Sequence, residues 1–286
     1  MGNKEKGIIL LLVSAVGFSL MAVFVKLSGD LPTIQKTLFR NLITALIAFG
    51  FILYYKKRFF GRRENQKFLF WRSVLGTLGI IFYFYAIDHL VLSDAEMLNK
   101  LSPFLLIIFS AVFLKERART FQVVAILVAF IGTLFIIKPA FSVDLIPYGA
   151  GVLSAIFAAG AYTFLRFLGD KENFYTIVFY FSFFSTVILL PFVFWFYEPM
   201  SLKQTVYLLL AGTFATVGQL GITAAYKFAP AKEISIFMYA TVIYSSIFSF
   251  IFFDQLPDRY SITGYLIIFA ASLYMFLRNK KGANSH

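Results

Sequence analysis

A few charged side chains lie inside long apolar runs of this sequence. Arg40 lies well within the run 33–55, and Glu96 and Lys100 lie one helical turn apart in the run 93–114. Charged groups at membrane depth cost free energy and usually face a cavity or a partner. Arg40 and Lys100 could bind a carboxylate or a phosphate, because both cations form charge-assisted hydrogen bonds with oxyanions. The alternative is structural, with Glu96 and Lys100 satisfying each other and Arg40 paired inside the protein.

Aromatic and polar residues of other apolar runs could complete a binding pocket. Aromatic walls with a few directional hydrogen-bonding groups are typical of small-molecule sites. Because aromatic residues make up 20 % of the chain, packing is the competing interpretation for each of them. Two further lysines, Lys26 and Lys36, lie near segment ends, where we expect them to snorkel to the outer lipid headgroups. The candidate substrate-binding residues are Ser14, Arg40, Tyr83, Glu96, Asn99, Lys100, Gln219 and Tyr239.

The side chains needed for catalysis or metal binding are missing from the apolar runs. The chain has no cysteine, and its two histidines lie at the loop end of the run 69–90 (His89) and at the end of the sequence (His286). The HExxH, GxSxG and Walker A patterns do not occur either. We therefore expect no catalytic residue, no metal site and no cofactor, and a membrane-embedded enzyme is the least favoured alternative.

The composition is typical of a membrane protein. Of the 286 residues, 60 % are hydrophobic and 14 % are charged, and the mean hydropathy is +0.80, whereas a soluble domain is about a quarter charged. A helix needs about 20 apolar residues to span a bilayer. We predict an all-α integral membrane protein with ten transmembrane helices, over residues 7–28, 33–55, 69–90, 93–114, 119–138, 146–168, 173–197, 203–226, 231–253 and 259–277.

The sequence contains one five-segment unit twice. Residues 76–114 match residues 215–253 without a gap, at an offset of 139, and a shorter stretch upstream recurs at an offset of 140. Matches that keep their order along both halves indicate a tandem duplication. We place the first repeat at residues 1–140 and the second at 141–286, joined by a linker that contains proline and glycine, at 138–149.

Basic residues gather in loops on one side of the predicted membrane, and both chain ends belong to that side. Because cytoplasmic loops carry the excess of Lys and Arg, we expect both termini in the cytoplasm. Each repeat has five helices, so the second must enter the membrane from the opposite side, and the repeats are inverted. Inverted repeats can exchange packings that open to opposite sides, which predicts transport by alternating access. An enlarged helical bundle without transport is the alternative. The net charge of +12 follows the loop pattern, so we expect no nucleic acid partner.

Three stretches carry a family resemblance: LSDAEMLNKLSPFLLIIFSAVFLKE at 92–116, its counterpart FAPAKEISIFMYATVIYSSIFSFIFFDQ at 228–255, and FRNLITALIAF at 39–49. Together with the ten-segment pattern, they resemble the EamA family of the drug/metabolite transporter superfamily. The resemblance implies a secondary transporter, whose partners are a small-molecule substrate and the lipid bilayer. We expect an exporter of a small organic metabolite, such as an amino acid or a related compound, in the plasma membrane of a bacterium. A passive channel or facilitator is the alternative, and a homodimer is left open.

Pro103 distinguishes the two copies, because the second has Val242 at the matching position. A proline inside a helix removes a backbone hydrogen bond and can open a kink, whereas a valine cannot. We therefore predict that the two halves bend unequally and that Pro103 is a gating residue.

Overall fold

The computed structural model describes residues 2–113, 119–137, 145–168, 171–228 and 234–283, and within these ranges all regular structure is helical. Most of the predicted linker falls outside these ranges. The predicted first repeat contains α1 (Asn3–Leu27), α2 (Thr33–Tyr54), the 3-10 helix η1 (Arg63–Asn65), α3 (Gln66–His89), α4 (Leu92–Asn99), α5 (Ser102–Phe113) and α6 (Thr120–Ile137). The second contains α7 (Ile146–Leu168), α8 (Phe174–Trp195), α9 (Leu202–Phe228), the 3-10 helix η3 (Ser235–Tyr239), α11 (Ala240–Phe253) and α12 (Arg259–Ala283).

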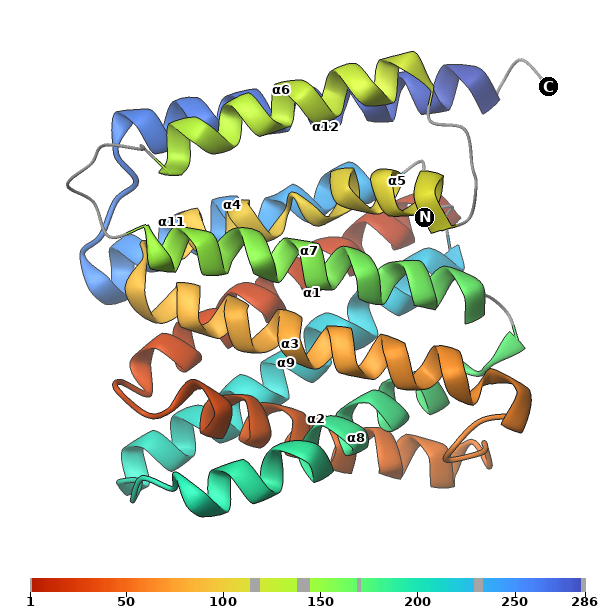
Figure 1. Ribbon diagram of the computed structural model, residues 1–286, viewed down its shortest axis with the longest axis vertical. Coiled ribbons are helices and arrows are strands. Elements are labelled where there is room, and N and C mark those ends of the chain that lie inside the picture. Colours follow the sequence, from red (N-terminus) through yellow and green to blue (C-terminus); the bar gives the residue numbers. More distant parts are fainter. Residues whose placement is uncertain (1, 114–118, 138–144, 169–170, 229–233, 284–286) are drawn as a thin grey trace.

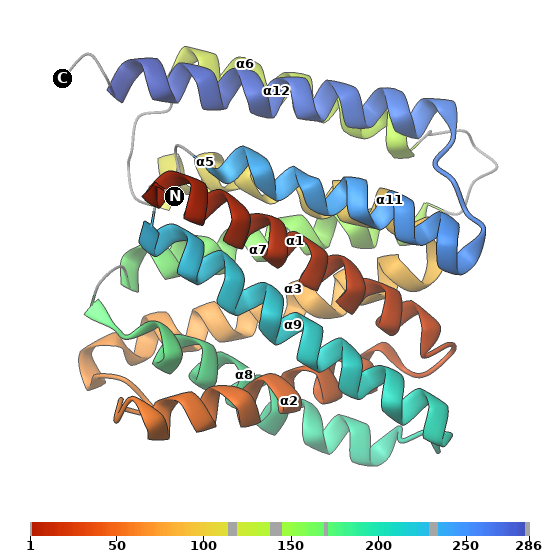
Figure 2. The ribbon, with the colours of Figure 1, turned by 180° about the vertical axis from the view of Figure 1, so that it is seen from behind.

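The helices stack in layers that each combine the two predicted repeats (Figure 1). α6 and α12 lie side by side at one edge of the bundle, and α2 and α8 lie side by side at the other (Figure 2). The most extensive packing is between α1 and α9 and between α3 and α7. In both pairs the first helix of one repeat packs on the third helix of the other. Since α1 and α7 also run in opposite directions (Figure 1), the arrangement confirms two inverted five-helix repeats.

Two glycines let α1 and α9 cross closely. A Cβ added to Gly17 would lie only 2.8 Å from the backbone nitrogen of Gly218. Small residues at helix contacts permit such an approach in membranes, where van der Waals packing is a main source of helix association. The hydroxyl of Ser14 donates a hydrogen bond of 2.6 Å to the Gly218 carbonyl oxygen at the same crossing. The two repeats therefore meet here almost backbone to backbone.

In neither repeat do the described residues of the fourth predicted span form a single regular α-helix. In the first repeat α4 ends at Asn99 and α5 begins at Ser102, so Pro103 lies in the first turn of α5, where its missing N–H breaks no hydrogen bond. In the second repeat the 3-10 helix η3 leads into α11, so the helical geometry changes at the matching place although Val242 replaces the proline. This change of geometry needs no proline, because η3 ends before Val242. The two interruptions do differ in form, as expected.

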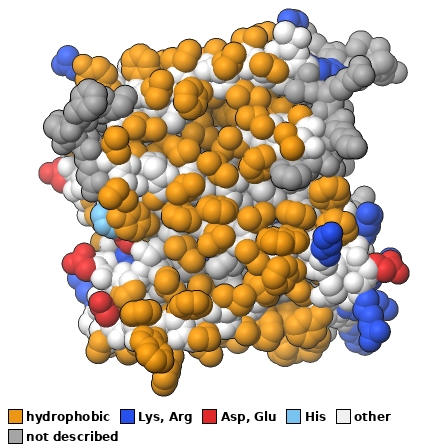
Figure 3. Space-filling view, viewed as in Figure 1, with side chains coloured by type: hydrophobic (Ala, Val, Ile, Leu, Met, Phe, Trp, Pro, Cys, Tyr) orange, Lys and Arg blue, Asp and Glu red, His pale blue; other side chains and the backbone are white. Residues whose placement is uncertain are grey.

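The described residues include nine helices that are long and apolar enough to cross a membrane. The tenth predicted span corresponds to α4 and α5 together, each of which is too short to span alone. In the space-filling view the middle of the visible face is apolar, and charged side chains lie toward its two ends (Figure 3). The protein is an all-α integral membrane protein, as its composition predicts.

Candidate functional site

A buried polar network joins the two interrupted helices. Glu96 of α4 is 1 % exposed, and one of its carboxylate oxygens accepts a hydrogen bond from the hydroxyl of Tyr83 on α3. The ammonium of Lys100, just past the end of α4, lies 3.6 Å from the other oxygen. Tyr239, the last residue of η3, donates a hydrogen bond of 3.3 Å to the Lys100 carbonyl oxygen. The network therefore connects both repeats through four of the predicted site residues.

The end of α4 makes this network possible. Carbonyl groups at the end of a helix have no intrahelical donor, and the Lys100 carbonyl receives its donor from the other repeat. The Lys100 ammonium is close enough to Glu96 for an ion pair but beyond hydrogen-bond distance. Its side chain is 13 % exposed. A ligand could therefore accept a hydrogen bond from Lys100 while the ion pair to Glu96 remains.

Two other predicted site residues hold helices together. Asn99 donates a hydrogen bond of 3.0 Å from Nδ2 to the hydroxyl of Ser154 on α7. Ser14 bonds the carbonyl of Gly218 on α9, as described above. Gln219 follows directly on α9 and is half-buried. Asn99 and Ser14 lie at contacts between the repeats, so their hydrogen bonds would have to change if the repeats moved against each other.

Arg40 belongs to a different group of side chains. It is 5 % exposed, and its Nη1 donates to the side-chain oxygen of Asn41, whose Nδ2 in turn donates to the hydroxyl of Ser185 on α8 at 2.7 Å. Within the described part of the chain, no hydrogen bond or ion pair joins Arg40 to Glu96 or Lys100. The predicted site residues therefore form one group around α4 and another between α2 and α8.

The ammonium groups of Lys36 and Lys26 both have acceptors within the protein. Lys36 is fully buried, and its ammonium lies 2.7 Å from the carboxylate of Asp88 on α3. Lys26 donates to the carbonyl oxygen of Leu90 and, at 3.1 Å, to the side-chain oxygen of Gln255. The snorkelling prediction is wrong for Lys36, whose ammonium is paired inside the protein. For Lys26, which is half-buried, it stays a prediction. These contacts link the ends of α1, α2 and α3 on one side of the bundle.

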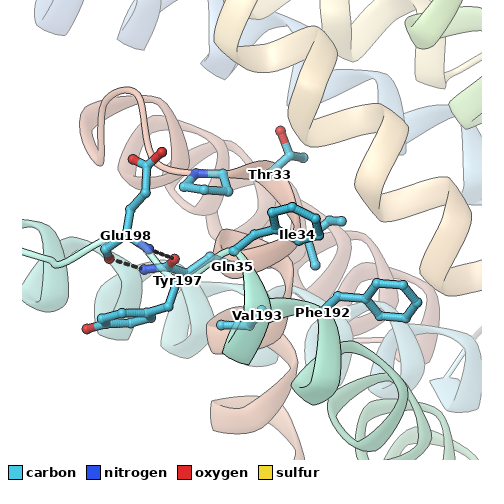
Figure 4. A pocket seen from close by; sticks show the side chains of 9 residues that line it. Thr33, Ile34, Gln35, Phe192, Val193, Tyr197 and Glu198 are labelled. Carbon is cyan, nitrogen blue, oxygen red and sulfur yellow. Dashed lines mark hydrogen bonds between the residues drawn. The ribbon is translucent and has the colours of Figure 1, made fainter.

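A pocket of about 490 Å³ lies between the start of α2 and the end of α8 (Figure 4). Its walls are mostly apolar and include Ile34, Phe192 and Val193. The side-chain amide of Gln35 makes two hydrogen bonds to the backbone of Glu198, of 3.0 and 3.1 Å, which tie the two helices together beside the pocket. None of the predicted site residues lines it. Among the described residues, no group of three metal-binding side chains gathers there or elsewhere.

The family comparison matches both repeats. The EamA-like transporter family aligns with residues 5–138 and again with residues 145–277. The chain belongs to the EamA-like transporter family. This assignment places the protein among the drug/metabolite transporters, so it is a membrane transporter and not an enzyme.

Relatives of this EamA chain match it over nearly its whole length. The pseudopaline exporter CntI of Pseudomonas aeruginosa is 33 % identical over 282 residues, which cover 97 % of this chain and 98 % of CntI. The human solute carrier family 35 member G1 is 26 % identical over 288 residues, covering 95 % of this chain and 79 % of the relative. A crystal structure with a TM-score of 0.67 and 15 % sequence identity covers 97 % of this chain and 98 % of its own, and it has the same fold.

Two charged residues of this EamA chain were missed in the sequence. Asp88 lies at the end of the third apolar run, where it looks like part of a loop, and only the fold brings it to Lys36. Arg72 lies near the start of the same run, close to a basic loop, and is 8 % exposed in the structure. The available signal was their position inside a span of α3, because ionisable residues at membrane depth are rare.

Proposed function

We propose that the protein is a secondary transporter that exports a small organic metabolite by alternating access between its two inverted repeats. The observation that carries the proposal is the exchanged pairing of α1 with α9 and of α3 with α7. When equivalent helices of two repeats make equivalent contacts, the halves can exchange conformations, and the exchange opens the opposite side. Membership of a transporter family supports the same conclusion.

A few hydrogen bonds join the repeats at each end of the bundle. At the end where α2 begins, Gln35 of the first repeat holds the backbone of Glu198 in the second. At the other end, the carboxylate of Glu172 in the second repeat accepts hydrogen bonds of 2.7 Å from the Arg62 backbone and the Asn65 side chain. Opening either end would break a few hydrogen bonds, each worth about 0.5–1.5 kcal/mol. Such contacts are weak enough to be exchanged during a transport cycle.

The proposed substrate site includes the network of Tyr83, Glu96, Lys100 and Tyr239. Transporters of this kind bind substrates at the repeat interface, where interrupted helices offer free backbone groups. The network lies at such interruptions in both repeats. Its carboxylate, ammonium and phenols could orient a small polar molecule while the surrounding aromatic residues contact the apolar part.

The direction of transport is proposed from charge and from relatives. The loop between α2 and α3 and the N-terminal residues carry Lys and Arg at one end of the bundle, and this end is proposed to face the cytoplasm of a bacterium. For the direction of transport, the most informative relative is CntI, which is named as an exporter. We therefore propose that both termini lie in the cytoplasm and that the protein exports an amino acid or a related metabolite across the plasma membrane.

The test is comparative profiling of exported metabolites. A bacterial host would express the wild-type chain or a Glu96→Gln variant at equal membrane levels, and mass spectrometry would follow small molecules in the medium. We expect one compound, or one chemical class, to accumulate faster with the wild type. Export by this chain would be contradicted if the media of wild-type, variant and empty-vector cells contained the same metabolite concentrations although folded protein was present in the membrane.

A further inference from the structure

Two buried arginines lie close together without a carboxylate. Arg40 on α2 is 5 % exposed and Arg72 on α3 is 8 % exposed. The largest charge–charge interaction of the Arg40 guanidinium is with Arg72, a like charge. Tyr162 of α7 is the other titratable group that interacts with both, and it supplies no carboxylate. Within the described residues, no ion pair joins either arginine to Asp or Glu.

Several polar atoms around these arginines have no hydrogen-bond partner. They are Nε of Arg40, Nε and Nη1 of Arg72, and the hydroxyl of Ser182 on α8. Ser182 lies one helical turn from Ser185, which belongs to the hydrogen-bonded group of Arg40. Phe181, next to Ser182, lies with its ring 3.9 Å from the Arg72 guanidinium. Unused donors on α2, α3 and α8 therefore gather where these three helices pack.

A purely structural role does not account for this arrangement. Burying a charge is costly unless it is paired, and here two charges of the same sign are buried together. The Phe181 ring offers Arg72 a cation–π contact but leaves its N–H groups unused. The fold does not require arginine at these places, because the second repeat has aromatic residues at the matching positions 179–181 and uncharged small residues at 211–213.

Because Gly76 has no side chain, it leaves room for the Arg72 guanidinium. A Cβ added to this glycine would lie 2.8 Å from Nη1 of Arg72 and 2.9 Å from the ring of Phe181. The guanidinium therefore lies about one turn along α3 from its own Cα, toward the middle of the helix. A side chain at position 76 would displace it from the place where it interacts with Arg40.

We propose that Arg40 and Arg72, with the Ser182 hydroxyl, bind an anionic group of the transported metabolite, a carboxylate or a phosphate. The inference rests on the proposed function, because it names the chemistry of the substrate. Guanidinium groups bind oxyanions through paired hydrogen bonds. An oxyanion between them would use the free donors and remove the repulsion between the two charges. The substrate therefore carries at least one negative charge.

The test uses purified full-length protein in nanodiscs of phosphatidylcholine, whose headgroup has no net charge. Thermal unfolding is followed against sodium phosphate and against the matched pair succinate and succinamide, its uncharged diamide, at constant ionic strength set with sodium chloride. The variants are Arg40→Gln and Arg72→Gln, and the charge-matched control is Arg63→Gln, which alters an exposed residue of η1. Arg40→Lys and Arg72→Lys keep the charge and serve where the glutamine variants do not fold.

We expect phosphate or succinate, but not succinamide, to raise the unfolding temperature of the wild type and of Arg63→Gln in a saturable way. In Arg40→Gln and Arg72→Gln the half-saturating concentration should rise about tenfold or more, and the lysine variants should lie between. The proposal is overturned if no anion stabilises the wild type saturably, or if the arginine variants respond like Arg63→Gln. In a parallel set of nanodiscs that contain phosphatidylglycerol, stabilisation by this lipid alone, dependent on these arginines, would assign the site to a lipid and overturn the proposal too.

The outcome is separable from that of the export experiment. If Arg72→Gln exports the compound found by metabolite profiling as well as the wild type does, the anion site is wrong and the exporter stands. If the wild type exports nothing while phosphate or succinate still stabilises it through Arg72, the anion site stands and the proposed function fails.

Discussion

Replacing Gly17 by alanine should force α1 and α9 apart. The added Cβ would lie 2.8 Å from the Gly218 nitrogen and 3.0 Å from the Phe214 carbonyl oxygen. Both contacts are backbone atoms of α9, which cannot rotate away as the end of a side chain could. Relief to an ordinary contact of 3.4 Å requires the helices to separate by about 0.6 Å at the crossing, the difference between 3.4 and 2.8 Å.

The expected cost follows from overpacking. Inserting a methyl-sized group into a close-packed contact costs about 1–3 kcal/mol. The same change at Gly50 of α2 is the matched control, because an added Cβ there would meet nothing within 4 Å. Alanine at position 50 should gain up to about 1 kcal/mol of helix propensity. The two variants should therefore differ by about 1–4 kcal/mol in the free energy of unfolding.

The assay is reversible unfolding in mixed micelles of a mild detergent and sodium dodecyl sulfate, followed by circular dichroism. Gly17→Ala should unfold at a lower dodecyl sulfate fraction than the wild type, and Gly50→Ala at the same fraction or a higher one. Equal unfolding of the two variants would refute the view that backbone contact at this crossing holds the repeats together.

Three further predictions concern charged or helix-breaking residues. Lys36→Met leaves the Asp88 carboxylate without its partner, so we expect the free energy of unfolding to fall by about 3–5 kcal/mol, and the double variant Lys36→Met/Asp88→Asn to recover most of it in the same micelle assay. Glu96→Gln removes the charge that faces Lys100, and the KM for export should rise about tenfold, measured on the profiled compound in vesicles. Pro103→Ala allows helix to form across the break, since alanine favours helix by about 3 kcal/mol over proline in helix interiors, and export should slow at unchanged KM.

Each of these has a clear contrary result. If the double variant is no more stable than Lys36→Met, the ion pair with Asp88 is not the reason why Lys36 stabilises the protein. The control is Lys57→Met, which replaces an exposed lysine and should leave the free energy of unfolding unchanged. An unchanged KM in Glu96→Gln would remove the network from the substrate site. Export by Pro103→Ala at the wild-type rate would argue against a gating role.

The fold was largely predictable because the duplication is recognisable in the sequence despite its strongly apolar composition. The constant offset between 76–114 and 215–253 predicts that the halves share a structure, and an odd number of spans makes them inverted. The interruption in the second repeat was not predictable from proline, because the η3 turn forms without one. It lies where Tyr239 bonds the Lys100 carbonyl, a contact between segments 139 residues apart.

The sequence predicted the four residues of the network around Glu96, but their pairing was predictable only where they are close in sequence. Glu96 and Lys100 form the ion pair that their spacing indicates. Contacts between distant segments could not be predicted from the sequence. Lys36 was therefore expected at the lipid headgroups, whereas the structure pairs it with Asp88, 52 residues later. Arg72 was overlooked for the same reason, since its importance depends on Arg40 on a neighbouring helix. A charge near the end of a span cannot be assigned to lipid or protein without its neighbours.

The central claim is that this chain is a carrier with alternating access, and counterflow tests it most directly. Proteoliposomes containing the purified protein would be loaded with an excess of the unlabelled compound identified by export profiling and then diluted into a trace of labelled compound. For an alternating-access carrier we predict that label accumulates transiently above its equilibrium level. Each outward step with unlabelled compound leaves the binding site open to the outside, where it can bind labelled compound and carry it inward. Label that rises only to equilibrium, with a rate that does not saturate, would contradict the account and indicate a channel.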